Sequence, residues 1–84
     1  MATAIVLGVY IPDRMELAGD VQQILTEYGC NVKTRLGLHQ AGDGCESYGL
    51  ILLELVGEEE QIEALEGALA ALDDVQVKKM AFKL

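Results

Sequence analysis

The 84-residue sequence has few of the residues that usually mark a metal or redox centre. It contains one His, two Cys, one Pro and no Trp. Cys30 and Cys45 show no CxxC or other zinc-like spacing. The start, MATAIVLGVYIPDR, lacks the basic segment of a signal peptide. We therefore expect a cytoplasmic protein with reduced thiols rather than a disulfide.

Basic residues are also scarce, since 6 Lys and Arg stand against 14 Asp and Glu, which gives a net charge of −8. Binding to DNA or RNA needs Lys and Arg to neutralise phosphates, and anionic membrane surfaces attract the same residues. No hydrophobic run reaches the length of a membrane span. We therefore expect neither a nucleic acid nor a membrane as a partner.

The most informative stretch that is present is residues 48–56, YGLILLELV. Its length and flanking glycines are typical of a strand. A half-buried strand alternates apolar and polar residues, but this one is apolar on both faces, with Glu54 as its one charge. The pattern predicts a central strand that is buried on both faces.

The rest of the chain supplies alternating strands and amphipathic helices. We expect strands at residues 4–11, 30–38, 48–56 and 75–83, and helices at about 14–28 and 58–72. Asp13 resembles the N-cap of the first helix, and Gly29 is expected to end it in a left-handed conformation. Gly67 in the second helix either permits close approach to the sheet or is simply tolerated.

This order predicts an α+β fold of the ferredoxin-like βαββαβ type, as a single domain over residues 1–84. Right-handed crossovers place both helices on one face of a four-stranded antiparallel sheet, whose central strands are the first and third. The helix-free face then carries apolar side chains, which predicts a homo-oligomer, either a dimer or a tetramer. The expected interface residues are Val6, Tyr10, Tyr48, Leu50 and Leu52.

Residues 30–38 alternate cleanly, which favours an edge strand with one face on the core. On this interpretation Cys30, Val32, Thr34, Leu36 and Leu38 face the core, and Cys30 is a small buried hydrophobic residue. The polar side could hold a small anionic ligand at a subunit junction, because Arg binds carboxylate or phosphate bidentately and Gly permits close approach. The candidate ligand-binding residues are Asn31, Lys33, Arg35 and Gly37. The alternative is an ordinary polar edge strand.

A polar loop, residues 39–46, joins the second and third strands and carries a candidate metal site. His39 and Cys45 lie at its two ends, with Asp43 and Glu46 nearby. Imidazole and thiolate are preferred ligands of soft and borderline metals, although most sites need three or four protein ligands. A metal or redox sensor using these residues, with Cys30 as a further thiol, is the alternative to a solvated hairpin tip.

Several short runs resemble a known family. The run ILTEYG at 24–29, RLGL at 35–38, the Asp13–Arg14 helix start and the Lys83–Leu84 ending are similar to those of small regulators of the iron-only hydrogenase system. That family is similar in fold to ACT domains and to the C-terminal domain of the nickel-responsive repressor. The resemblance implies an oligomeric, ACT-like regulator linked to hydrogenase expression or maturation.

Two departures limit what the resemblance implies about a ligand. Amino-acid-binding ACT domains commonly have a Gly-containing loop after the first strand, whereas this chain has residues 11–14, IPDR. The nickel repressor uses several His, whereas this chain has one, and it lacks the ribbon-helix-helix segment that binds DNA.

The sequence offers little catalytic chemistry, since it has no Ser-His-Asp set, phosphate loop or recognisable carboxylate pair. We therefore expect a non-catalytic, cofactor-free regulatory domain that binds a small effector or a protein partner. A small ferredoxin-like enzyme remains an alternative, because a fold does not determine function.

Overall fold

The computed structural model describes residues 3–12, 14–38 and 48–83. These residues form four strands and two helices, with one short 3-10 helix before the second strand. They are β1 (Thr3–Ile11), α1 (Arg14–Glu27), the 3-10 helix (Gly29–Asn31), β2 (Val32–Leu38), β3 (Gly49–Leu55), α2 (Glu59–Ala70) and β4 (Gln76–Lys83). The predicted order of elements is confirmed.

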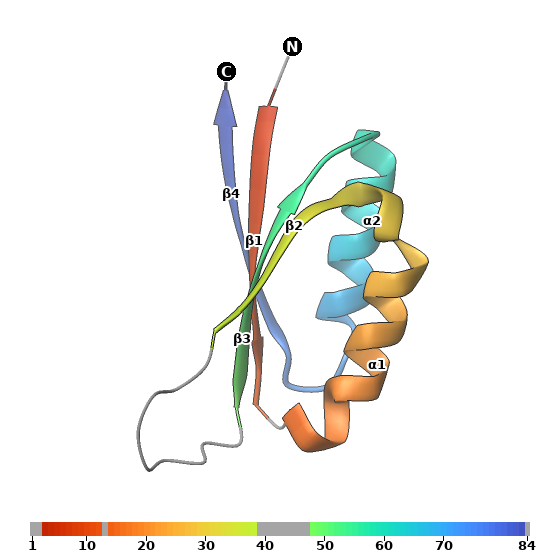
Figure 1. The fold of residues 1–84 in the computed structure, drawn as a ribbon, viewed down its shortest axis with the longest axis vertical. Coiled ribbons are helices and arrows are strands. Elements are labelled where there is room, and N and C mark those ends of the chain that lie inside the picture. The colour runs from red at the N-terminus through yellow and green to blue at the C-terminus, as the bar shows by residue number, and fades with distance from the viewer. Residues whose placement is uncertain (1–2, 13, 39–47, 84) are drawn as a thin grey trace.

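The four strands form one antiparallel sheet in the order β2-β3-β1-β4. Each half of the chain is a split βαβ unit, because one strand of the other half lies between its two strands. Both helices lie on the same face of the sheet (Figure 1), so the α+β, ferredoxin-like prediction is correct. β1 and β3 are central, and β2 and β4 are the edges.

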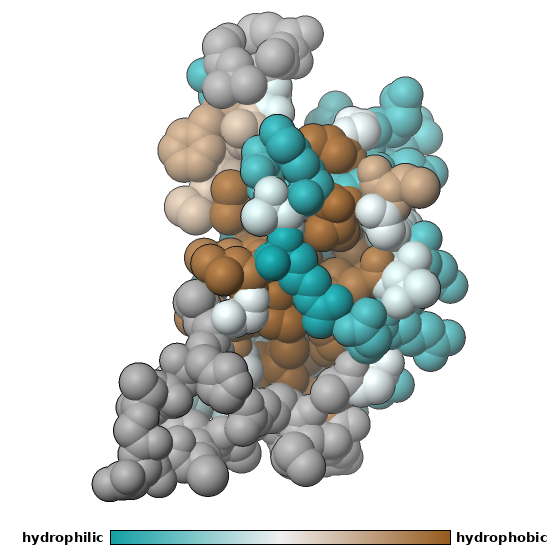
Figure 2. Space-filling view, in the orientation of Figure 1, coloured by the Kyte–Doolittle hydropathy of each residue, from teal (hydrophilic) through white to brown (hydrophobic). Residues whose placement is uncertain are grey.

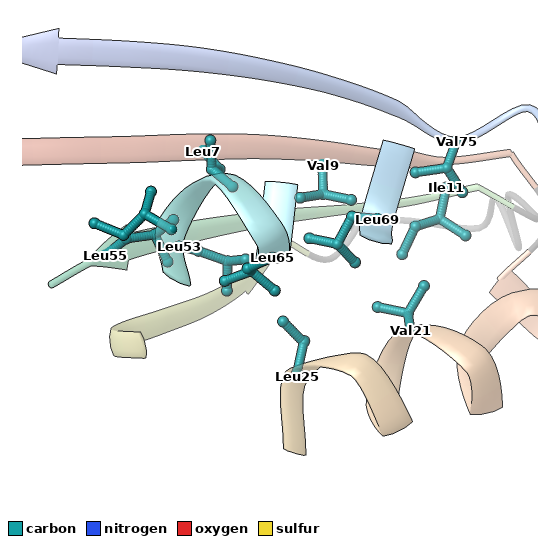
Figure 3. Close-up of a cluster of buried hydrophobic side chains, with 11 residues drawn as sticks. Leu7, Val9, Ile11, Val21, Leu25, Leu53, Leu55, Leu65, Leu69 and Val75 are labelled. Atoms are coloured by element: carbon teal, nitrogen blue, oxygen red, sulfur yellow. The ribbon is translucent and has the colours of Figure 1, made fainter. Parts of the chain in front are cut away.

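The hydrophobic core fills the space between the sheet and the two helices. Alternation in β1 directs Leu7, Val9 and Ile11 toward the helices, as Figure 3 shows, while Leu53 and Leu55 do the same from β3. The helices contribute residues at helical spacing, namely Val21 and Leu25 from α1 and Ile62, Leu65 and Leu69 from α2. Among the described residues no further helix is present to cover the opposite face of the sheet.

The junction between β3 and α2 depends on one glycine and one asparagine. Gly57 has a φ of 104°, a conformation that other residues rarely adopt. The Asn31 side-chain amide donates to the Val56 carbonyl (3.0 Å), and the Val56 N–H donates to the Asn31 carbonyl (2.8 Å). A Cβ on Gly57 would lie 2.5 Å from Asn31 Nδ2. These contacts hold the start of β2 against the end of β3.

The prediction about Gly29 was wrong, and the structure decides between the two alternatives for Gly67. Gly29 does not end α1 in a left-handed conformation, because it begins the 3-10 helix and Gly57 is the positive-φ glycine of the described residues. Gly67 does not allow α2 to approach the sheet closely, since a Cβ there would meet no atom within 4 Å. Gly67 is therefore a tolerated helix glycine on an exposed face.

β2 departs from the clean alternation that its sequence suggests. Its register against β3 shifts between Val32, which pairs with Leu55, and Thr34, which pairs with Glu54. One extra residue in a strand reverses the face of every side chain that follows it. Val32 therefore packs against the core while Leu36 lies on the helix-free face, which corrects the prediction that both face the core.

Candidate functional site

The helix-free face of the sheet is the main unusual surface of the protein. Paired residues from neighbouring strands form rows across it. In the order β2-β3-β1-β4, one row is Thr34, Glu54, Val6 and Met80. The next two rows are Leu36, Leu52, Gly8 and Lys78, then Leu38, Leu50, Tyr10 and Gln76. At the other end Ala4 pairs with Phe82.

Large apolar side chains on this face are open to solvent in the single chain. Leu36 is 51% exposed, Met80 50% and Phe82 52%. The five residues predicted as interface are half-buried, and the Tyr10 and Tyr48 rings stack with centroids 5.6 Å apart. Figure 2 shows hydrophobic surface on the side of the sheet away from the helices, at the left of the view. A soluble monomer rarely exposes so many neighbouring apolar side chains.

Three of these apolar residues were missing from the sequence-based interface. The parity of the last strand already placed Met80 and Phe82 on one face, so they could have been included. Leu36 could not, because its face depends on the register shift in β2.

Polar groups on this face occupy two separate places. Glu54 Oε1 accepts a hydrogen bond from the Thr34 hydroxyl at 3.2 Å, and Glu54 Oε2 lies 4.0 Å from Lys33 Nζ. Lys78 and Gln76 lie on β4, at the other edge of the sheet. Glu54 and Lys78 are thus separated by the apolar residues between them.

The four predicted ligand-binding residues do not form one cluster within a single chain. Asn31 bonds Val56, and Lys33 approaches Glu54. Arg35 and Gly37 pair with Leu53 and Ile51, which places them on the helix side of the edge strand. A shared ligand site made by these residues stays a prediction, and it would need a second subunit to bring them together.

The predicted metal residues His39 and Cys45 lie outside the described residues, as do Asp43 and Glu46. Cys30 lies in the 3-10 helix and is exposed, so its prediction as a buried core residue was wrong. Among residues 3–12, 14–38 and 48–83 no group of three potential metal ligands comes together. The metal site at the loop stays a prediction.

A pocket of about 320 Å³ lies on the helix side, at the start of α2. Its wall combines apolar side chains from Ile5, Leu55, Ile62 and Ala81 with a larger share of polar surface, to which Lys79 and Glu59 add charge. Lys79 Nζ is 3.2 Å from Glu66 Oε1, which links β4 to α2. With its ammonium group paired to a carboxylate, Lys79 has less to offer an anionic ligand.

A comparison with models of known protein families shows to which family the chain belongs. The family model described as TM1266-like, iron-only hydrogenase system regulator, matches residues 3–79. The chain belongs to this family. The resemblance inferred from the sequence is therefore confirmed, and the family's description assigns its members a regulatory role.

Solved structures support the same fold. The protein TM1266 from Thermotoga maritima has a TM-score of 0.82 at 24% identity, covering 98% of this chain and 100% of that one. The ACT domain of GTP pyrophosphokinase from Chlorobium tepidum has a TM-score of 0.67 at 13% identity, covering 95% and 89%. These matches establish an ACT-like fold.

A third similar structure is CPII, a nitrogen regulatory PII-like protein from Thiomonas intermedia K12, bound to ADP, AMP and bicarbonate. Its TM-score is 0.59 at 16% identity, covering 99% of this chain and 93% of that one. No curated protein matches the chain. Within the part of the chain that the structure describes, no helix is long and apolar enough to cross a membrane.

Proposed function

We propose that this family member is a non-catalytic regulatory module that works as a homo-oligomer, assembled through the helix-free face of its sheet. The observation that carries the proposal is the row of apolar side chains on that face, of which Leu36, Met80 and Phe82 are half exposed in the single chain. Covering these side chains removes apolar surface from water, which is the main driving force for association.

A two-fold dimer is the simplest assembly that covers this face. The same patch then lies on both subunits and must be self-complementary. The edges of the sheet are less suitable for pairing, because Lys residues on β4 and on β2 discourage strand addition. A tetramer would require a second surface in addition to this face.

The regulatory part of the proposal concerns a small effector or a protein partner of the iron-only hydrogenase system, in the cytoplasm. An effector that binds at a subunit junction would favour one arrangement of the subunits over another, and that difference is the signal. The family description and the ACT and PII-like folds support this role. The candidate effector residues are still Asn31, Lys33, Arg35 and Gly37.

Sedimentation velocity tests the assembly. We expect the wild-type protein to be an oligomer in the micromolar range and Met80→Asp to be a folded monomer, because it puts a charge into the apolar face. Ala64→Asp is the matched control, since Ala64 is exposed on α2 and receives the same charge. A wild-type monomer throughout the micromolar range would refute the proposal.

Native mass spectrometry of protein purified anaerobically from its own cells tests the effector. We expect an oligomer with additional non-covalent mass that denaturation releases, and the mass of that species identifies its class. An oligomer with no additional mass, both alone and in cell extract of hydrogenase-producing cells, would contradict binding of a small effector. The remaining interpretation would be an interaction subunit that binds a protein partner and no small ligand.

A further inference from the structure

The polar and apolar groups on the helix-free face follow a diagonal arrangement. Seven apolar residues form a stripe from the end of β4 across β1 and β3 to β2 (Figure 1 shows this order of strands). They are Phe82, Met80, Val6, Leu52, Leu36, Leu50 and Tyr10. Glu54, with Thr34, lies on one side of the stripe, and Lys78, with Gln76, lies on the other.

Burying this face in a dimer would bury the charges of Glu54 and Lys78, and within the protomer Glu54 has the exposed Lys33 ammonium 4.0 Å away. A charge that is removed from water without a partner is costly, and like charges placed opposite each other add to the cost. Within one chain Glu54 and Lys78 are two strands and one row apart, about 12 Å between Cα atoms from sheet spacings. They are too far apart to pair with each other inside one protomer.

We infer that two copies of this chain pack their helix-free faces together around a two-fold axis parallel to the apolar stripe, so that Glu54 of each copy pairs with Lys78 of the other. Such an axis exchanges the two sides of the stripe. It places each acidic group over the partner's basic group and keeps stripe against stripe. This inference rests on the proposed assembly through the same face.

The spacing of strands and rows supports a two-fold axis along the apolar stripe over an axis perpendicular to it. The axis that exchanges the Glu54 and Lys78 positions crosses β1 between Val6 and Gly8 and runs along the stripe. Gly8 has no side chain, which allows the two sheets to approach closely at the axis. An axis perpendicular to the stripe would place Glu54 against Glu54 and Lys78 against Lys78, which is repulsive.

Charge reversal tests the pairing. All proteins carry Lys33→Gln, because Lys33 lies near Glu54 within the protomer. We expect Glu54→Lys and Lys78→Glu each to weaken dimerisation by at least about a hundredfold, since each creates two like-charge pairs. The double variant, whose net charge equals that of its background, restores most of the affinity. Glu63→Lys and Lys83→Glu are exposed controls for net charge alone and leave the affinity within about threefold.

Cross-linking of introduced thiols tests the same arrangement without charge reversal, in a Cys30→Ser/Cys45→Ser background. Packed sheets lie about 10 Å apart, farther than the Cα separation of about 7 Å that a direct disulfide allows, so a short bis-maleimide joins the thiols. Glu54→Cys with Lys78→Cys is expected to form covalent dimers with this reagent. Glu54→Cys alone is expected to stay monomeric on a denaturing gel. Covalent dimers from Glu54→Cys alone would demonstrate the perpendicular axis and overturn the inference.

The outcomes separate this inference from the proposed function. A dimer that Met80→Asp disrupts but that neither charge reversal weakens would overturn the pairing and leave the sheet-face assembly intact. A double variant weaker than both single variants would do the same. A wild-type monomer would overturn both. If a reversed variant fails to fold, Glu54→Gln and Lys78→Gln replace it, and at least about a tenfold loss from each is expected.

Discussion

At the scale of single residues, Gly57 shows how one backbone conformation joins distant parts of the chain. Its φ of 104° turns the chain from β3 into α2, and its missing Cβ leaves room for the Asn31 amide. Asn31 uses this position to bond Val56 in both directions. The sequence shows a Gly after a strand, but it does not show that Asn31, at the end of the 3-10 helix, packs against this Gly.

We expect Gly57→Ala to lower the free energy of unfolding by about 2–3 kcal/mol. A side chain at positive φ costs about 1–2 kcal/mol, and displacing the Asn31 amide loses a hydrogen bond worth about 1 kcal/mol. Urea denaturation measures the change. Gly67→Ala is the matched control, because nothing lies within 4 Å of its Cβ position, and it is expected to stabilise by about 0.5–1 kcal/mol.

A double-mutant cycle separates the two contributions at Gly57. In an Asn31→Ala background the clash is absent, so Gly57→Ala is expected to cost only the conformational part, about 1–2 kcal/mol. Equal costs in both backgrounds would show that the Asn31 contact does not constrain Gly57.

At the scale of elements, β2 shows where sequence patterns succeed and where they fail. The alternation of β1 and the doubly apolar β3 identified the core and the helix-free face, because a period of two holds over regular strands. The same rule failed in β2 at the register shift, which leaves no mark in the pattern of apolar residues. Because of the same register shift, Arg35 and Lys33 approach different faces of the sheet, which the sequence pattern does not show. The predicted ligand site is therefore not assembled within one chain.

The register shift predicts that the same substitution has a large effect at one position of β2 and a small effect at another. Val32→Asp is expected to lower the free energy of unfolding by about 2 kcal/mol or more, because Val32 packs against the core. Leu36→Asp is expected to change it by no more than about 0.5 kcal/mol, since Leu36 is half exposed. Both substitutions are made in the monomeric Met80→Asp protein, and their free energies of unfolding are compared with that of Met80→Asp alone. Loss of assembly then does not contribute to either value. Similar costs at both positions would contradict the shift.

At the scale of the whole molecule, the small size of the domain and the uncovered face of its sheet both limit the apolar surface that a single chain can bury. A chain of 84 residues buries a limited share of its surface alone, and here both helices serve one side of the sheet. Association through the other side would cover the second face of β1 and β3, which also carries apolar residues. Folding and assembly are then linked, because a partner that binds only the native state stabilises it by mass action.

This linkage predicts that thermal stability depends on protein concentration. In the range where the dimer is populated, each tenfold rise in concentration is expected to raise the Tm of the wild-type protein by about 3–5 °C. Met80→Asp is expected to show a Tm that is independent of concentration, because it has no assembly to lose. Circular dichroism and scanning calorimetry over a hundredfold concentration range measure both. A concentration-independent Tm for a wild-type protein that sediments as a dimer would mean that the subunits separate before they unfold, and that the sheet face contributes little to the stability of the fold.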